Sequence, residues 1–237
     1  MYKRLIIIST MGALAGIVII SINPINSTVL NLAFLLCTVA AWSGSIVLAW
    51  NWKPLRIALM IVPVLLAIPF SLPGSAIQES ELRDDYVRGM TKLENTKYIW
   101  GGESSRGIDC SGLPRRAFRG ALIAYGFRHA DGGAFRAYLE QWWFDASAKA
   151  LSEGYRNYTS PIGDKTTIRE MNEQYLLPGD LAVTTSGIHV IAYAGEGKWI
   201  QADPGIGSVA TLNGKTDHNQ WFKVPVTLHR WRILSEQ

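Results

Sequence analysis

The chain beyond its apolar beginning contains a single cysteine, Cys110, in the sequence Gly107-Ile-Asp-Cys-Ser-Gly112. A cysteine attacks a carbonyl carbon as its thiolate, and the free N–H groups at the start of a helix lower the pKa of a thiol. Because Pro114 is acceptable only in the first turn of a helix, the helix that contains it should begin close to Cys110. A structural cysteine would be expected among apolar neighbours, whereas Asp109 and Ser111 flank this one. The pattern therefore favours a nucleophile.

A cysteine nucleophile requires a base, and the same part of the chain offers four histidines. His189 opens an apolar run, where a rigid strand could hold its ring against a helix end, and it is the best candidate. His129 lies in a polar loop, His218 among Asp and Asn, and His229 near the chain end, so these three are interpreted as surface residues. The amide oxygen of Gln201 could accept the second ring N–H and fix the tautomer of the base. Without an HExxH motif or clustered Cys and His ligands, no metal or other cofactor is predicted.

The elements that must position these residues change in pattern along the chain. Helical spacing of apolar residues predicts helices over residues 79–95, 111–125 and 134–151, with a loop over residues 98–107. The aromatic stripe of the third helix is interpreted as core or as a ledge for substrate. Strand-like runs follow over residues 181–185, 189–194, 198–202, 222–229 and 231–234. Helices followed by an antiparallel meander predict an α+β domain.

Three apolar stretches, residues 5–22, 29–50 and 55–72, precede this domain, and all 19 acidic residues lie beyond them. A membrane core about 30 Å thick needs about 20 helical residues, so each stretch is interpreted as a transmembrane helix. The third contains Pro63 and Pro69, which predict a kink that neighbouring groups can accommodate. A cleaved signal peptide is the alternative for the first stretch, but no small-x-small site precedes Asn23 and two more apolar stretches follow.

Basic residues near the apolar stretches predict their orientation. Lys3 and Arg4 precede the first stretch, Lys53 and Arg56 lie around the second connection, and the first connection at residues 23–28 has none. By the positive-inside rule, the amino terminus and the second connection are cytoplasmic and the domain lies on the other side. These four residues also account for the net charge of +4, because removing them from the 23 basic residues leaves 19, equal to the 19 acidic residues.

A domain that is formally neutral offers no basic surface for nucleic acid, which would be expected to cluster on one face. Arg115, Arg116 and Arg119 form a short basic run on a predicted helix, and such a run more often marks a solvated face. We therefore predict no nucleic-acid partner.

Five short blocks of this sequence resemble the NlpC/P60 cysteine peptidases, papain-like enzymes that hydrolyse peptidoglycan stem peptides. In chain order the blocks are Tyr98-Ile-Trp-Gly-Gly, Asp109-Cys-Ser-Gly-Leu113, Leu177-Pro-Gly-Asp-Leu181, His189-Val-Ile-Ala-Tyr193 and Trp199-Ile-Gln-Ala202. The Asp-Cys-Ser-Gly and Pro-Gly-Asp-Leu blocks are specific only in combination. The resemblance implies a papain-like α+β domain, and the three transmembrane helices predicted from the apolar stretches precede it.

The resemblance also implies a role for each matching residue. Cys110 would be the nucleophile, His189 the base and Gln201 the polar residue that orients it, at a position where the family often has a second histidine. Tyr98 would line the site beside the cysteine, and Asp109 and Ser111 would hold the free amino end of the substrate. The backbone N–H of Cys110 would help to stabilise the oxyanion.

Two features depart from the family pattern: an insertion at about residues 127–175 and the three-helix anchor. We expect residues 1–76 to form the anchor and linker, and residues 77–237 to form the peptidase domain. The predicted protein hydrolyses cell-wall peptides on the outer side of a bacterial inner membrane. The alternatives are an amidase or acyl transferase that acts on a lipid or protein, and an inactive module that binds the wall.

Overall fold

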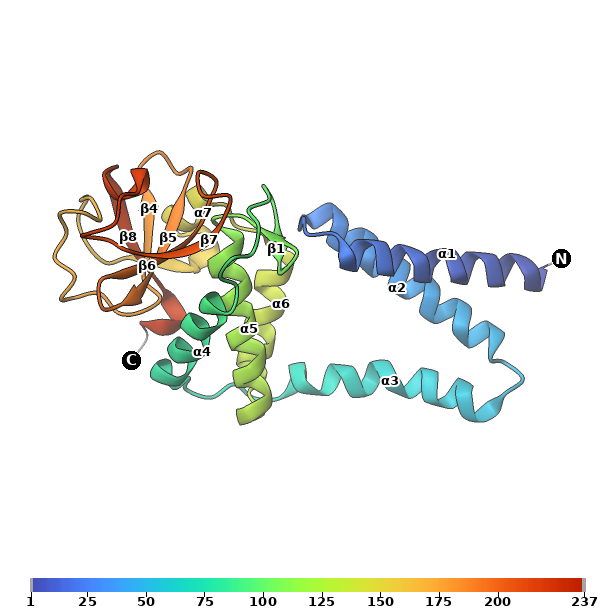
Figure 1. The fold of residues 1–237 in the computed structure, drawn as a ribbon. Helices are drawn as coiled ribbons and strands as arrows, with labels where there is room; N and C mark the ends of the chain where they lie inside the picture. Colours follow the sequence, from blue (N-terminus) through green and yellow to red (C-terminus); the bar gives the residue numbers. More distant parts are fainter. Residues whose placement is uncertain (1, 236–237) are drawn as a thin grey trace.

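The structure, a computed structural model, describes residues 2–235 of the chain. Three long helices form one end of the molecule, and a domain of shorter helices and a sheet forms the other (Figure 1). Residue 1 and residues 236–237, at the outer ends of the two predicted domains, lie outside the described part. The boundary at residues 76 and 77 stays a prediction.

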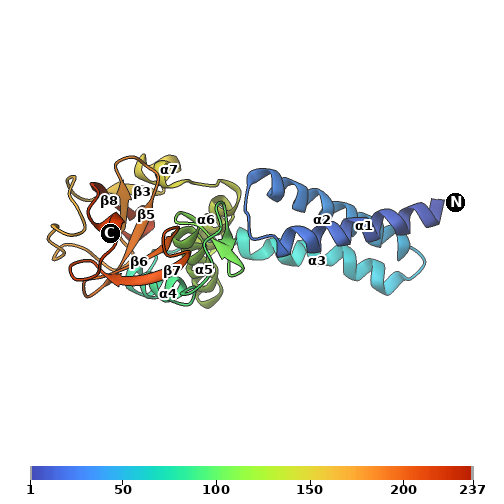
Figure 2. The same cartoon turned by 45° about the horizontal axis from the view of Figure 1, so that its top comes forward.

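The three long helices are α1 (Tyr2–Ile22), α2 (Thr28–Leu48) and α3 (Lys53–Ser71). Each is long and apolar enough to cross a membrane, and each lies within three residues of its predicted bounds. Most of their large apolar side chains are exposed, so this surface suits lipid better than water. Figure 2 shows all three extending from the same end of the domain. Pro63 and Pro69 lie inside α3, as predicted.

The domain begins with α4 (Glu79–Thr91) and continues with α5 (Gly112–His129). The prediction of one helix over residues 134–151 is wrong, because two helices are present: α6 (Gly132–Trp143) and α7 (Ala148–Ser152). Phe144 ends α6 in an extended conformation, and the Ser147 hydroxyl starts α7 by accepting a hydrogen bond from the backbone N–H of Ala150. The prediction of a loop over residues 98–107 is also incomplete. Here β1 (Glu103–Ser104) pairs with β2 (Gly107–Ile108) to form a short hairpin.

A six-stranded antiparallel sheet follows, in the order β3-β8-β4-β5-β6-β7. Its strands are β3 (Thr159–Pro161), β4 (Leu181–Thr184), β5 (Val190–Gly195), β6 (Lys198–Asp203), β7 (Ser208–Asn213) and β8 (Val226–Trp231). The predicted meander is confirmed for β4, β5 and β6 and continues into β7, whereas β8 returns to pair with β4. The two edge strands were not predicted, because β3 is short and contains proline and β7 is a mixed, half-exposed sequence. Helices followed by an antiparallel sheet confirm the α+β class.

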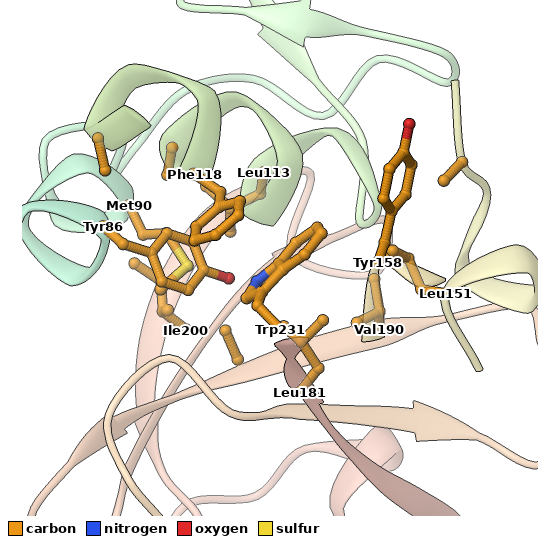
Figure 3. Packing of buried hydrophobic residues seen from close by; sticks show 14 of the residues in the cluster. Tyr86, Met90, Leu113, Phe118, Leu151, Tyr158, Leu181, Val190, Ile200 and Trp231 are labelled. Atoms are coloured by element: carbon orange, nitrogen blue, oxygen red, sulfur yellow. The ribbon is translucent and has the colours of Figure 1, made fainter. Parts of the chain in front are cut away.

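The main core lies between α4, α5 and one face of the sheet (Figure 3). Trp231 of β8 stacks on Phe118 of α5, with ring centroids 4.4 Å apart, and Tyr86 of α4 meets the same phenyl ring edge-on. Leu113, in the first turn of α5, and Val190, at the start of β5, belong to the same buried cluster. The amino end of α5 and the first residues of β5 therefore contribute to the same core.

Helix α6, which lies within the predicted insertion, faces the three long helices. Phe135 packs edge-on against Phe70 of α3, and Trp142 packs against Phe34 of α2. The side-chain amide of Asn31 in α2 donates to the backbone oxygen of Trp142 over 2.9 Å. The aromatic stripe of α6 is therefore a contact surface for the apolar helices as well as part of the core.

Candidate active site

Cys110 lies two residues before the start of α5, where the carboxylate of Asp109 organises the chain. One oxygen of Asp109 accepts hydrogen bonds from the backbone N–H of Gly112 (2.6 Å) and the hydroxyl of Ser111 (3.0 Å). The other oxygen accepts from the backbone N–H of Gly101 over 2.9 Å. Asp109 thus connects the Tyr98-Ile-Trp-Gly-Gly block to the cysteine block and fixes the conformation of the nucleophile loop.

His189 immediately precedes β5, and its ring is held by Gln201 of β6. The ring Nε2 lies 2.7 Å from the Gln201 Oε1 atom, and the backbone N–H of His189 donates to the Thr184 hydroxyl over 3.1 Å. Because an amide oxygen can only accept a hydrogen bond, Nε2 carries the proton and Nδ1 retains the lone pair. The imidazole is therefore held in the tautomer that can accept a proton at Nδ1.

The sulfur of Cys110 lies beside the backbone on both sides of His189. Its Sγ atom is 3.8 Å from the backbone oxygen of Ile188, and the nearby backbone N–H of Val190 acts to lower the pKa of the thiol. Cys110 is 5% exposed, His189 1% and Gln201 0%. The fold thus brings the three predicted residues into one buried region, although no hydrogen bond joins the thiol to the imidazole within residues 2–235.

The thiol and the imidazole are both neutral near pH 7. Burial, followed by the charge of Asp109, raises the pKa of the Cys110 thiol to about 12, and the nearby backbone N–H groups lower it only in part. Desolvation therefore outweighs the helix end, contrary to the expectation from sequence. Burial also lowers the pKa of His189, while Gln201, Asp203 and Asp109 act in the opposite direction.

Trp221 and Asp203 also lie in this region, and the sequence analysis did not identify them. The indole of Trp221 stacks on the His189 ring, with centroids 4.1 Å apart and planes 15° apart. Its Nε1 atom donates to the buried carboxylate of Asp203 over 3.3 Å, and Asn219 donates to the same carboxylate over 2.6 Å. Asp203 lies two residues after Gln201 on β6, and this same-face spacing could have identified it. Nothing in the local sequence marks Trp221.

Tyr98 is half-buried near the cysteine, and its backbone N–H donates to the Gly207 oxygen over 2.8 Å. Burial and the charges of Cys110 and Asp109 raise the pKa of its phenol to about 12. Ser111 is buried, and its hydroxyl is engaged by Asp109. The predicted substrate-binding residues therefore lie near the thiol, and their roles remain predictions.

The structure corrects two predictions about residues outside this region. His229 is buried rather than on the surface, because β8 lies between β3 and β4, and its Nε2 is 2.9 Å from the Thr227 hydroxyl. His129 and His218 are exposed, as predicted.

The basic run on α5 is the second correction. Arg115 and Arg119 are buried rather than solvated, because both pair with the buried carboxylate of Glu103, whereas Arg116 is exposed as predicted. The helical spacing of the run is correct, but its outward face meets the β1–β2 hairpin.

Comparison with solved structures finds similar chains at low sequence identity. NlpC1 from Trichomonas vaginalis is 19% identical over 63% of this chain and 43% of its own, with a TM-score of 0.41. The P60 domain of an antigen from M. avium subspecies paratuberculosis is 18% identical over 64% of this chain and 96% of its own (TM-score 0.39). The peptidoglycan hydrolase RipB from Mycobacterium tuberculosis is 20% identical over 68% of this chain and 70% of its own (TM-score 0.38).

This chain therefore spans less than half the length of the Trichomonas protein. No curated protein matches it. A family profile, in contrast, matches residues 95–226, which is more than half of the chain and includes both halves of the site described above. The chain belongs to the NlpC/P60 family.

Proposed function

We propose that this protein is a membrane-anchored cysteine peptidase that hydrolyses amide bonds in peptidoglycan stem peptides. Cys110 is the nucleophile, His189 the base, and Gln201 the residue that orients the imidazole. The observation that carries the proposal is the 2.7 Å contact between His189 Nε2 and Gln201 Oε1, on a segment whose backbone lies against the Cys110 sulfur. Such a contact leaves Nδ1 free to take a proton from a thiol.

In the first half of the reaction, His189 accepts the thiol proton as the Cys110 sulfur attacks the carbonyl carbon of the substrate amide. The backbone N–H of Cys110 donates to the developing oxyanion. The imidazolium then protonates the leaving amine, and the C–N bond breaks to give a thioester. In the second half, His189 accepts a proton from water as the water oxygen attacks the thioester. The C–S bond then breaks to release the acid product, and the imidazolium returns its proton to the Cys110 sulfur.

A neutral resting pair agrees with this sequence of steps, because the proton moves only when the substrate carbonyl is in place. Contacts between catalytic groups are often long in a free enzyme and shorten in the complex with substrate. Trp221 covers one face of the imidazole and would restrict its rotation. Asp109, Ser111 and Tyr98, which lie near the thiol, would hold the free amino end of the stem peptide.

The three apolar helices support membrane anchoring in the proposed arrangement. The amino terminus lies in the cytoplasm of a bacterial cell, and the domain lies outside the inner membrane, where peptidoglycan is found. A reporter enzyme that is active only outside the cytoplasm should be active when it is fused after residue 26 or residue 76. The same reporter should be inactive when it is fused after residue 51. Any other pattern would contradict this topology.

The experiment that tests the reaction compares the full chain in detergent with its Cys110→Ala variant on purified muropeptides. New amino groups that appear only with the unaltered thiol would support hydrolysis. If the muropeptides stay unchanged with both proteins, hydrolysis of muropeptides is contradicted. The remaining hypotheses are then an amidase or transferase that acts on a lipid or protein, and an inactive module that binds the wall. Cleavage that persists in Cys110→Ala would contradict the assigned nucleophile.

A further inference from the structure

A cavity of about 290 Å³ lies where the connection between α1 and α2 meets the domain. Figure 1 shows this connection beside β1, at the junction of the two parts of the molecule. The cavity does not include Cys110 or His189, so it is separate from the candidate active site. It is the opening that combines the ends of the apolar helices with charged residues of the domain.

The walls of the cavity are held by backbone contacts between the two parts. The backbone N–H of Asn26 donates to the Gly101 oxygen over 2.9 Å, and the backbone N–H of Glu103 donates to the Pro24 oxygen over 2.8 Å. The Asn31 amide donates to the backbone of Trp142. Because these contacts join the helix connection to β1 and α6, the cavity is a formed feature of the fold.

One side of the cavity is positively charged. The carboxylate of Glu103 is neutralised, because Arg119 lies 3.1 Å and Arg115 3.5 Å from its oxygens. Arg116, which also lines the cavity, is exposed and has no carboxylate within ion-pair distance among residues 2–235. Arg106 lies close by, with its guanidinium 3.4 Å from the Ser21 oxygen, and likewise has no carboxylate partner in that range. Two guanidinium groups are thus available to an anion.

The other side is apolar and continues along the helices. Ile20 of α1, Leu30 and Phe34 of α2, and Trp142 of α6 line it. The rest of α1 and α2 is apolar enough to lie in a membrane, so this wall would be at the level of the lipid head groups, where indole rings are enriched. A ligand that matches both sides has an anionic head and a hydrocarbon chain.

We propose that this cavity binds the phosphate-bearing head group of a membrane lipid with net negative charge, with Arg116 as the principal phosphate ligand. A guanidinium presents paired N–H donors that match phosphate oxygens, and its charge does not depend on pH in the physiological range. The proposal depends on membrane anchoring by α1 and α2 but not on the thiol chemistry. A phospholipid and a prenyl pyrophosphate share this chemistry, and binding measurements can distinguish them.

The test is native mass spectrometry of the full chain in detergent, titrated separately with phosphatidylglycerol, a prenyl pyrophosphate and zwitterionic phosphatidylcholine. Arg116→Gln should raise the dissociation constant for the anionic lipids about fivefold, since one arginine near a membrane surface contributes about 1 kcal/mol. Arg232→Gln, which alters an exposed arginine that does not line the cavity, is the matched control and should change nothing. The lipid bound more tightly by the unaltered chain identifies the source of the phosphate.

A second variant separates the cavity from general surface charge. Ser104 lines the cavity, and Ser104→Phe would fill it while leaving every arginine in place, so binding of the anionic lipids should be lost. The proposal would be overturned if Arg116→Gln bound the anionic lipids as tightly as the unaltered chain, or if Arg232→Gln lost as much affinity as Arg116→Gln. Full binding by Ser104→Phe would also overturn it. Cys110→Ala should bind like the unaltered chain, so failure of the peptidase assay would leave this result standing.

Discussion

The hydrogen bond between His189 and Gln201 offers the sharpest test of the proposed site. Gln201 is fully buried, and in the free protein its Oε1 atom accepts the Nε2–H of a neutral ring. When the imidazole takes the thiol proton, this N–H becomes part of a cation. A hydrogen bond to a charged group contributes about 1.5–3 kcal/mol. Gln201→Ala should therefore reduce kcat/KM about 10- to 150-fold.

Gln201→Glu keeps the shape of the side chain but places a carboxylate beside the ring. An opposite charge at this distance favours the imidazolium, so the pKa of His189 should rise by about 1–3 pH units. The base is active only when unprotonated, so the acid limb of the kcat/KM profile should move to higher pH. The apparent values will belong to the Cys110–His189 pair rather than to either residue alone.

The assay follows muropeptide hydrolysis by the full chain in detergent from about pH 4 to about pH 9, a range that includes the usual pKa of histidine. Gln174→Ala, which removes an exposed amide elsewhere, serves as the control, and thermal unfolding checks that each variant is folded. Unchanged kcat/KM and an unchanged acid limb in both Gln201 variants would refute the assigned role of this residue.

Three further predictions concern a residue that contacts the site and two residues elsewhere in the domain. Trp221→Leu should move the acid limb to higher pH, because burial lowers the pKa of His189 and this variant uncovers the ring; an unmoved limb would contradict it. The pKa of His229 is also lowered by burial, so unfolding takes up protons and the folded chain loses stability as the pH falls below about 6.5. His229→Gln should therefore lose less free energy of unfolding between about pH 7 and about pH 5 than the unaltered chain, as urea titration would measure. Gly132→Ala would force a methyl group into a backbone carbonyl just after α3 and should cost about 1–3 kcal/mol in unfolding experiments, whereas Gly120→Ala, with open space around it, should cost nothing.

The two departures from the family pattern are physically connected in this fold. Helix α6 lies within the insertion predicted at about residues 127–175, and its aromatic side chains pack against α2 and α3. A domain held against apolar helices needs an apolar contact surface that a free domain does not. The predicted insertion therefore includes the surface against which α2 and α3 pack.

The sequence by itself determined the features that depend on neighbouring residues. The start of α5 follows from Pro114 and from Asp109, whose side chain reaches a backbone N–H only three residues away. The three long helices follow from continuous apolar runs, and β4, β5 and β6 follow from short apolar runs separated by turns. Each of these signals is complete within about 20 residues, so no tertiary information is needed to interpret it.

Tertiary structure decided the environment of each charged or titratable group. Arg115 and Arg119 have the spacing of a solvated face, yet both are buried and pair with Glu103. The stacking of Trp221 on His189 depends on the path of the chain after β7. The pKa of Cys110 rises because burial removes water from the thiolate, and burial depends on packing of segments far apart in sequence. Desolvation is a property of the whole fold, and a local pattern carries no measure of it.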